Sequence, residues 1–316
     1  MSLSCGESPK SKVIIGIPTY KRPQGLAKLL ESITKLECSN IELSIVVAEN
    51  DQQHRAGAKL VTKVSDNYPL PLASIDVSHR GISFVRNALL DVAFLDYEAD
   101  FLVMVDDDEW VEPKWLNALL ETHFKTGCEV VGGNTLAEFE GEPPSWTKAL
   151  AIYFPEQASL SQEIPLLESS ASVLLHKCVY FGFGQQRFDP FYSVYGGGDK
   201  EYFTRLKAQG IKFASAHTAI SHELFDGARV TKRWAQERAF RIGAADMRII
   251  LLHHRSSLLS EIIKILLATL VGASGSVLSL NSKSRMKYWL LLQRQLGKLS
   301  GLLNKQKPVY EKVHGK

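Results

Sequence analysis

Short hydrophobic runs alternate with amphipathic stretches along the first third of the chain. The runs, which resemble buried strands, lie at 13–17, 41–48, 73–77 and 101–105. Pro23 opens a stretch with apolar residues at a helical spacing (Leu26, Leu29, Leu30 and Ile33), and 81–95 has similar character. This β-α-β alternation predicts an α/β fold with an open, mostly parallel sheet and flanking helices.

The pattern is less regular after residue 110. Strands are predicted at 129–133 and 172–176, on either side of a polar, Pro-containing stretch. Gly196, Gly197 and Gly198 then lead through Asp199 into a helix. Asp199 is predicted to be the N-cap, a position that Asp favours for structural reasons alone. The glycines before it predict backbone that approaches a ligand closely, or a loop that moves.

The chain changes character near Arg255. Residues 265–280 carry no charge, but sixteen residues are short for a spanning helix of about 20. A basic amphipathic helix is predicted at 285–303, with Trp289, Leu292, Leu296, Leu299 and Leu303 on its apolar side. These helices either pack on protein or lie in the plane of a membrane with anionic lipid. We favour the membrane interpretation, and the packing interpretation stays open.

Composition narrows the class of protein. The 316 residues are 45% hydrophobic and 22% charged, as expected for a globular protein. The net charge of +3 is too small to indicate a nucleic-acid partner, and nine Lys or Arg residues with one acid lie from Asn281 onward. The four cysteines have no C-x-x-C spacing, which argues against zinc and predicts a reducing cytosol. The polar N-terminus has no apolar signal core.

The run at 101–105 ends abruptly in Asp106, Asp107, Asp108 and Glu109. Adjacent carboxylates repel one another, and a divalent cation gives a reason to gather them. Mg²⁺ and Mn²⁺ take oxygen ligands and often bridge protein carboxylates to substrate phosphates. The alternative is a solvated acidic turn that opens the next helix. Further polar clusters at 18–22 and 49–51 also follow strands, where ligands bind in open α/β sheets.

Together these clusters resemble the family 2 inverting glycosyltransferases of the GT-A fold, within them the bacterial succinoglycan or exopolysaccharide type. The resemblance covers roughly residues 12–250. It rests on an ordered series of segments: Ile17-Pro18-Thr19-Tyr20-Lys21-Arg22-Pro23, Glu49-Asn50-Asp51, Gly81-Ile82-Ser83-Phe84-Val85-Arg86-Asn87, Asp106-Asp107-Asp108, Gly197-Gly198-Asp199 with Glu201, Phe203 and Arg205, and the downstream Arg229, Trp234, Arg238, Arg241 and Gly243.

The resemblance implies Mn²⁺ or Mg²⁺ as cofactor and a nucleotide sugar, UDP-sugar favoured, as donor. The implied donor-site residues are Pro18, Thr19, Tyr20, Arg22, Glu49, Asp51, Arg86, Asp106 and Asp107. Asp108, with Asp106, would bind the metal, and Asp199 would be the general base. A cation that neutralises the leaving diphosphate, and one carboxylate that accepts the acceptor's proton, suit inversion in a single displacement.

The acceptor side is less clear. The resemblance places Gly197, Gly198, Glu201 and Trp146 there. The family often has Glu where Gly198 stands, and Glu201 either compensates or is an exposed helix acid. Trp146 either stacks on an acceptor sugar or packs in its own domain. His222 follows a short apolar strand and is either a further metal ligand or an ordinary hydrogen-bonded histidine.

The implied organisation is a disordered leader at 1–11, a catalytic domain at 12–254 and a helical tail at 255–316. Residues 12–110 would bind the nucleotide and 111–254 the acceptor, which would be a lipid-linked glycan or polysaccharide. The expected location is the cytoplasmic face of the membrane, with peripheral contact through the tail. Two alternatives remain: a non-enzymatic assembly factor, and a nucleotidyltransferase, which the absence of glycine from 18–23 disfavours.

Overall fold

A computed structural model describes residues 10–155, 157–182 and 184–303. Most of the predicted leader therefore lies outside the described residues, and Ser11 already begins the first strand. The strands are β1 (Ser11–Thr19), β2 (Ile41–Glu49), β3 (Leu72–Asp76), β4 (Phe101–Met104), β5 (Glu109–Val111), β6 (Val130–Phe139), β7 (Gln162–Ile164), β8 (Val173–His176) and β9 (Phe213–Phe225). The helices are α1 (Pro23–Ile33), α2 (Ala56–Val64), α3 (Ile82–Asp91), α4 (Trp115–Thr126), α5 (Cys178–Phe181), α6 (Tyr192–Tyr195), α7 (Gly198–Ala208), α8 (Lys232–His253), α9 (Leu258–Leu278) and α10 (Ser282–Leu302).

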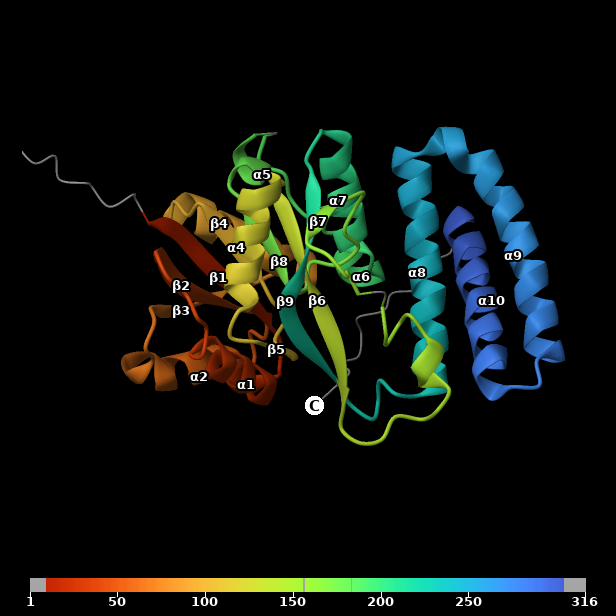
Figure 1. Ribbon diagram of the computed structural model, residues 1–316, viewed down its shortest axis with the longest axis horizontal. Helices are drawn as coiled ribbons and strands as arrows, with labels where there is room; N and C mark the ends of the chain where they lie inside the picture. Colours follow the sequence, from red (N-terminus) through yellow and green to blue (C-terminus); the bar gives the residue numbers. More distant parts are fainter. Residues whose placement is uncertain (1–9, 156, 183, 304–316) are drawn as a thin grey trace, which may run out of the picture.

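Within the described residues the strands form one mixed sheet in the order β3-β2-β1-β4-β8-β6-β9-β5, with β7 paired to β9 (Figure 1). The pairings among β1, β2, β3 and β4 are parallel, because helices carry the chain back between these strands. Antiparallel pairing enters at β8, which lies between β4 and β6. The predicted α/β class, a mixed sheet with flanking helices and a C-terminal helical region, is confirmed.

Helices cover both faces of the sheet, and alternate strand residues supply two cores. On β1, Val13, Ile15 and Ile17 pack with α1 and α4, whereas Ile14 packs with α3 and α7 on the other face. Continuous apolar runs such as 13–17 are typical of strands buried on both faces. This packing fixes the carboxyl ends of β1, β2 and β4, from which the polar clusters extend.

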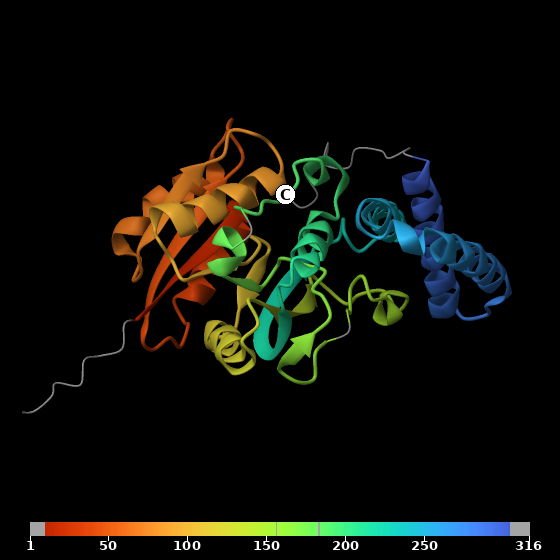
Figure 2. The ribbon, with the colours of Figure 1, turned by 90° about the horizontal axis from the view of Figure 1, so that it is seen from above.

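The C-terminal helices form a separate layer at the end of the molecule far from β1–β3 (Figure 2). The main partner of α10 is α8, and their backbones touch: a Cβ on Gly297 would lie 1.9 Å from the carbonyl oxygen of Phe240. The third core cluster, which includes Trp146 and Trp234, connects this layer to the segment after β6. The helical packing unit therefore begins with α8, earlier than the expected tail boundary at 255.

Candidate active site

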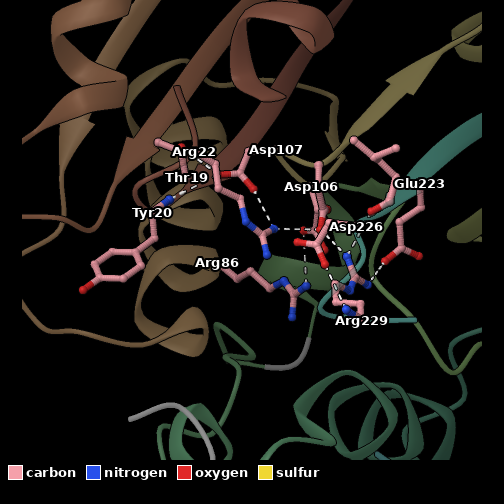
Figure 3. A network of polar contacts seen from close by, with 11 residues as sticks. Thr19, Tyr20, Arg22, Arg86, Asp106, Asp107, Glu223, Asp226 and Arg229 are labelled. Carbon is pink, nitrogen blue, oxygen red and sulfur yellow. Dashed lines mark hydrogen bonds and ion pairs between the residues drawn. The ribbon is translucent and has the colours of Figure 1, made fainter. Parts of the chain in front are cut away.

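The acidic run after β4 lies where the loops following β1 and β9 meet it (Figure 3). Asp107 is buried and accepts hydrogen bonds from Thr19 Oγ1 (2.8 Å) and from the backbone N–H of Tyr20 (3.2 Å). Thr19 is itself 3% exposed. These contacts give Thr19 and Asp107 a positioning role, because they tie the loop after β1 to the acidic loop. Pro18 is also buried, inside β1.

Asp108 lies between two guanidinium groups. Its Oδ2 is 2.7 Å from Arg22 Nη1 and 2.9 Å from Arg229 Nη1. The second nitrogen of Arg229 contacts Glu223, a residue of β9. One carboxylate oxygen thus receives two charge-assisted hydrogen bonds, which are stronger than neutral ones.

Arg86 joins Asp199 to the acidic run. This buried arginine of α3 contacts Asp199 through Nη1 and lies 3.5 Å from Asp106 through Nη2. The other oxygen of Asp199 accepts a hydrogen bond from the backbone N–H of Ser170 (3.2 Å). The sequence separates Asp106 and Asp199 by 93 positions, and the fold brings both carboxylates onto one guanidinium.

Burial and neighbouring carboxylates raise the pKa values of Asp106, Asp107 and Glu109. Burial, with Asp108 and Asp199 adding to it, raises the pKa of Asp106 to about 6, although Arg86 opposes the shift. Burial raises the pKa of Asp107 to about 7, with a further contribution from Asp108. Burial and the neighbouring Asp106 and Glu223 raise the pKa of Glu109 well above its usual value. The neighbouring arginines therefore do not fully neutralise the negative charge of this carboxylate cluster.

The donor set fits a divalent cation. Asp106 Oδ1 is buried and makes no hydrogen bond within the described residues, although Arg86 Nη2 lies 3.5 Å away in an ion pair. The described residues contain no ready group of three or more His, Cys, Asp or Glu ligands. Mg²⁺ and Mn²⁺ are commonly held by one or two carboxylates plus substrate phosphates, which this arrangement would allow. Asp106 and Asp108 are the candidates to hold the ion.

The polar cluster after β2 contains two acids: Glu49, which has a structural role, and Asp51, which has an oxygen available to a ligand. Glu49 is fully buried, and its oxygens accept hydrogen bonds from the backbone N–H groups of Asp51 and Gly57 (2.7 Å each). Its carboxylate caps the start of α2, so the structure gives Glu49 a structural role, and its contact with the nucleoside stays a prediction. Asp51 Oδ2 is buried without a hydrogen-bond partner among the described residues, so Asp51 remains the candidate acceptor.

The sequence matches a known protein family. The family model described as glycosyl transferase family 2 matches residues 14–180, more than half of the chain. This protein belongs to glycosyl transferase family 2. The chain is 30% identical over 244 residues to the succinoglycan biosynthesis protein ExoM of Rhizobium meliloti, covering 75% of this chain and 74% of that protein.

Solved structures share the GT-A fold of this family 2 glycosyltransferase. The Pyrobaculum calidifontis mannosyltransferase PcManGT, in complex with GDP-Man and Mn²⁺, is 16% identical with a TM-score of 0.63, covering 94% of this chain and 88% of that one. Staphylococcus aureus TarS with UDP-GlcNAc is 13% identical with a TM-score of 0.53, covering 93% and 92%. At such identities the similarity shows the fold.

The start of α7 differs from expectation. Gly197 is the N-cap, and Asp199 is the second residue of the helix, so the N-cap prediction for Asp199 is wrong. Gly197 has a φ of +86°, and a Cβ there would lie 2.4 Å from Ala245 of α8. The glycine therefore allows close approach of a helix. Gly198 is the first residue of α7, and a Cβ there would lie 3.1 Å from Tyr192.

Two residues expected on the acceptor side, Glu201 and Trp146, have structural contacts of their own. Glu201 is buried and contacts Arg205 and His253, so it is neither an exposed acid nor a substitute base. Trp146 is 8% exposed and packs edge-on against Tyr153, which supports the packing alternative.

His222 points away from the acidic run. Its ring nitrogens lie 3.0 Å from Glu138 and 3.3 Å from Glu112, and its ring stacks on Trp110. These contacts favour the alternative of an ordinary hydrogen-bonded histidine. Because strand side chains alternate between faces, its neighbour Glu223 is the β9 residue that faces the acidic run.

Sequence reasoning assigned no role to several residues of this family 2 site. Arg229 and Asn87 belong to the quoted motifs, and Asn87 pairs with both backbone groups of Phe188 beside Arg86. Glu109 and Glu223 are paired across β5 and β9. The alternation of side chains along a strand that ends near residue 225 could have indicated that Glu223 faces the site. The pairing of this strand with β5 could not be read from the sequence.

Proposed function

We propose that this family 2 glycosyltransferase is an inverting, metal-dependent enzyme that moves a sugar from a nucleotide diphospho-sugar to an acceptor hydroxyl. The observation that carries the proposal is the shared contact of Arg86 with Asp106 and Asp199. One guanidinium couples the donor-site carboxylate to the candidate base. A nucleotidyltransferase or an assembly factor gives no reason for this coupling.

The residues have separate tasks in this reaction. A divalent cation held by Asp106 and Asp108 would neutralise charge on the leaving diphosphate. Asp51 would accept a hydrogen bond from the nucleoside. Asp199, oriented by Arg86 and by the N–H of Ser170, would take the proton of the acceptor hydroxyl. The hydroxyl oxygen forms the new glycosidic bond as the bond to the diphosphate breaks.

The proposed donor is a UDP-sugar and the proposed acceptor is a lipid-linked glycan or polysaccharide. Support for the acceptor is the similarity to a protein of succinoglycan biosynthesis, which suggests bacterial surface glycan synthesis. TarS is described with UDP and UDP-GlcNAc, and PcManGT with GDP-Man and Mn²⁺. These complexes leave GDP as the competing nucleotide.

We further propose that α9 lies in the plane of the membrane at its cytoplasmic face. In the described chain one stretch, Arg255–Leu278, is long and apolar enough to span a membrane. Its exposed face carries Leu259, Ile263, Leu266, Leu267, Leu270 and Val271. However, α10 packs along α9 and carries Lys283, Arg285 and Lys287. These charges lie beside the turn after α9, so a spanning α9 would carry them across the bilayer and take Arg294 of the packed α10 into lipid, whereas an in-plane helix leaves the charges for anionic headgroups.

Calorimetric titration of UDP and then GDP, with and without Mn²⁺, tests the donor site. The wild type should bind UDP only with Mn²⁺, and Asp108→Ala should lose this binding. The exposed Asp66 supplies the control Asp66→Ala, which should bind as the wild type does. If the folded wild type binds neither nucleotide, the proposed function is wrong.

A further inference from the structure

Arg229 holds the carboxylate that the proposed function assigns to the metal. It lies in the turn between β9 and α8, is 7% exposed, and donates to Asp108 Oδ2 and to Glu223. Arg22 donates to the same oxygen of Asp108. The two guanidinium groups therefore occupy the positions at this oxygen where a metal cation would bind.

A divalent ion at Asp108 Oδ2 would meet both guanidiniums at short range. Arginine stays protonated in proteins, so the guanidinium of Arg229, paired with Asp108 and Glu223, keeps its charge. Like charges at such short range repel one another, so a bound ion and this guanidinium disfavour each other at the same oxygen. The ion and Arg229 must therefore compete for Asp108.

Hydrogen bonds fix the backbone of Arg229, and its guanidinium has two acceptors besides Asp108, namely Glu223 and the carbonyl of Leu224. Its backbone N–H donates to Asp226 Oδ1 (2.9 Å), and its carbonyl accepts from the Tyr153 hydroxyl (2.9 Å). The guanidinium stacks on aromatic rings, with its centre 4.4 Å from the ring centre of Phe225. A planar guanidinium released from Asp108 suits the paired oxygens of a diphosphate.

We propose that Arg229 is an internal counter-cation of the donor site. It pairs with Asp108 and Glu223 in the nucleotide-free enzyme. It yields Asp108 to the divalent cation and turns to the diphosphate oxygens when the metal and nucleotide enter. This inference rests on the proposed function, and it gives Arg229 opposite effects on the two ligands: Arg229 weakens binding of the metal alone and strengthens binding of the nucleotide.

The test is calorimetric titration of Mn²⁺ alone, and then of UDP at saturating Mn²⁺, on the full chain. Arg229→Met keeps an apolar stem against Phe225 and removes the charge. It should bind Mn²⁺ about tenfold more tightly than the wild type, equivalent to about 1.4 kcal/mol, and UDP about tenfold more weakly. The control is Arg233→Met, because Arg233 is 88% exposed and pairs within α8 with Glu237. The control should match the wild type within about twofold.

Unchanged or weaker Mn²⁺ binding by folded Arg229→Met would overturn the inference while the proposed function stands. Absence of metal-dependent UDP binding in the wild type would overturn both. Circular dichroism and thermal melting establish folding. If Arg229→Met does not fold, Arg22→Met repeats the test at the same oxygen of Asp108. It should also tighten Mn²⁺ binding, and unchanged affinity would again overturn the inference.

Discussion

Replacement of Arg86 by Met should destabilise the enzyme and change its pH response. The substitution removes the guanidinium between Asp106 and Asp199 and leaves the two carboxylates without their shared partner. Loss of one partner from a buried ion pair costs about 3–5 kcal/mol. The side chains of Asp106 and Asp199 are 32% and 22% exposed, so we expect the lower end, about 3 kcal/mol. For a chain of this size that loss lowers the Tm by roughly 5 °C.

Arg86 also lowers the pKa of Asp106, which burial holds at about 6. Without Arg86 this pKa rises further, and metal-dependent UDP binding should need a higher pH. Thermal melts in EDTA measure the first effect, and UDP titrations with Mn²⁺ across pH 5.5–8.5 measure the second. Arg55→Met is the control, because Arg55 pairs with Asp76 at the surface and should cost under about 1 kcal/mol. If Arg86→Met resembles this control in both assays, the reasoning is refuted.

Three further predictions follow from other parts of the structure. Glu49→Gln should lower the free energy of unfolding, measured in urea, by about 2 kcal/mol and leave the Kd for UDP unchanged, because Glu49 caps α2. A large loss of UDP affinity without a loss of stability would show that Glu49 binds the nucleotide. The raised pKa values of Asp106 and Asp107 contribute stability that is present below about pH 4 and lost as pH rises through 6 and 7. The Tm in EDTA should therefore fall from pH 6 to pH 8, and Mn²⁺ should restore it. A Tm that does not change with pH would contradict burial and like charge as the origin of these shifts. Leu267→Glu on the exposed face of α9 should abolish flotation with anionic vesicles without lowering the Tm, whereas unchanged flotation would exclude α9 as the membrane contact.

The fold was predictable where burial is continuous. Runs such as 13–17 and 101–105 lie in strands buried on both faces, and their apolar character does not depend on pairing partners. The helix α8 was not predicted, because many of its buried positions are small, among them Ala235, Ala239 and Gly243. Small residues give little amphipathic contrast, and their importance comes from close packing with α10.

The predicted apolar side of 285–303 was only partly informative. Trp289 and Leu296 stay more than a third exposed, whereas Met286, Leu290, Gly297 and Gly301 face the other helices. Trp289 and Leu296, on the predicted apolar side, are therefore not the residues that pack on the other helices. The opposite side of α10 is buried, because Gly297 and Gly301 let it pack closely against α8.

The acidic site was predictable in location and less so in detail. The sequence places Asp106, Asp108 and Asp199 in motifs, but a carboxylate that caps a helix looks the same in sequence as one that binds a ligand, so the helix-capping role of Glu49 could not be read from the sequence. His222 and Glu223 are neighbours on β9, and strand side chains alternate between faces, so only one of the two can face the site. The contacts of Arg86 and Arg229 depend on residues about 110 to 120 positions apart, which local patterns do not encode.

The most direct test of the central claim is donor turnover by Asp199→Asn, measured together with Mn²⁺-dependent UDP binding. The account predicts that binding stays within about threefold of the wild type. Transfer to an acceptor should fall by about 10²–10⁴-fold, because the proton acceptor is gone. Turnover at the wild-type rate, with binding intact, would contradict the assignment of Asp199 as the base.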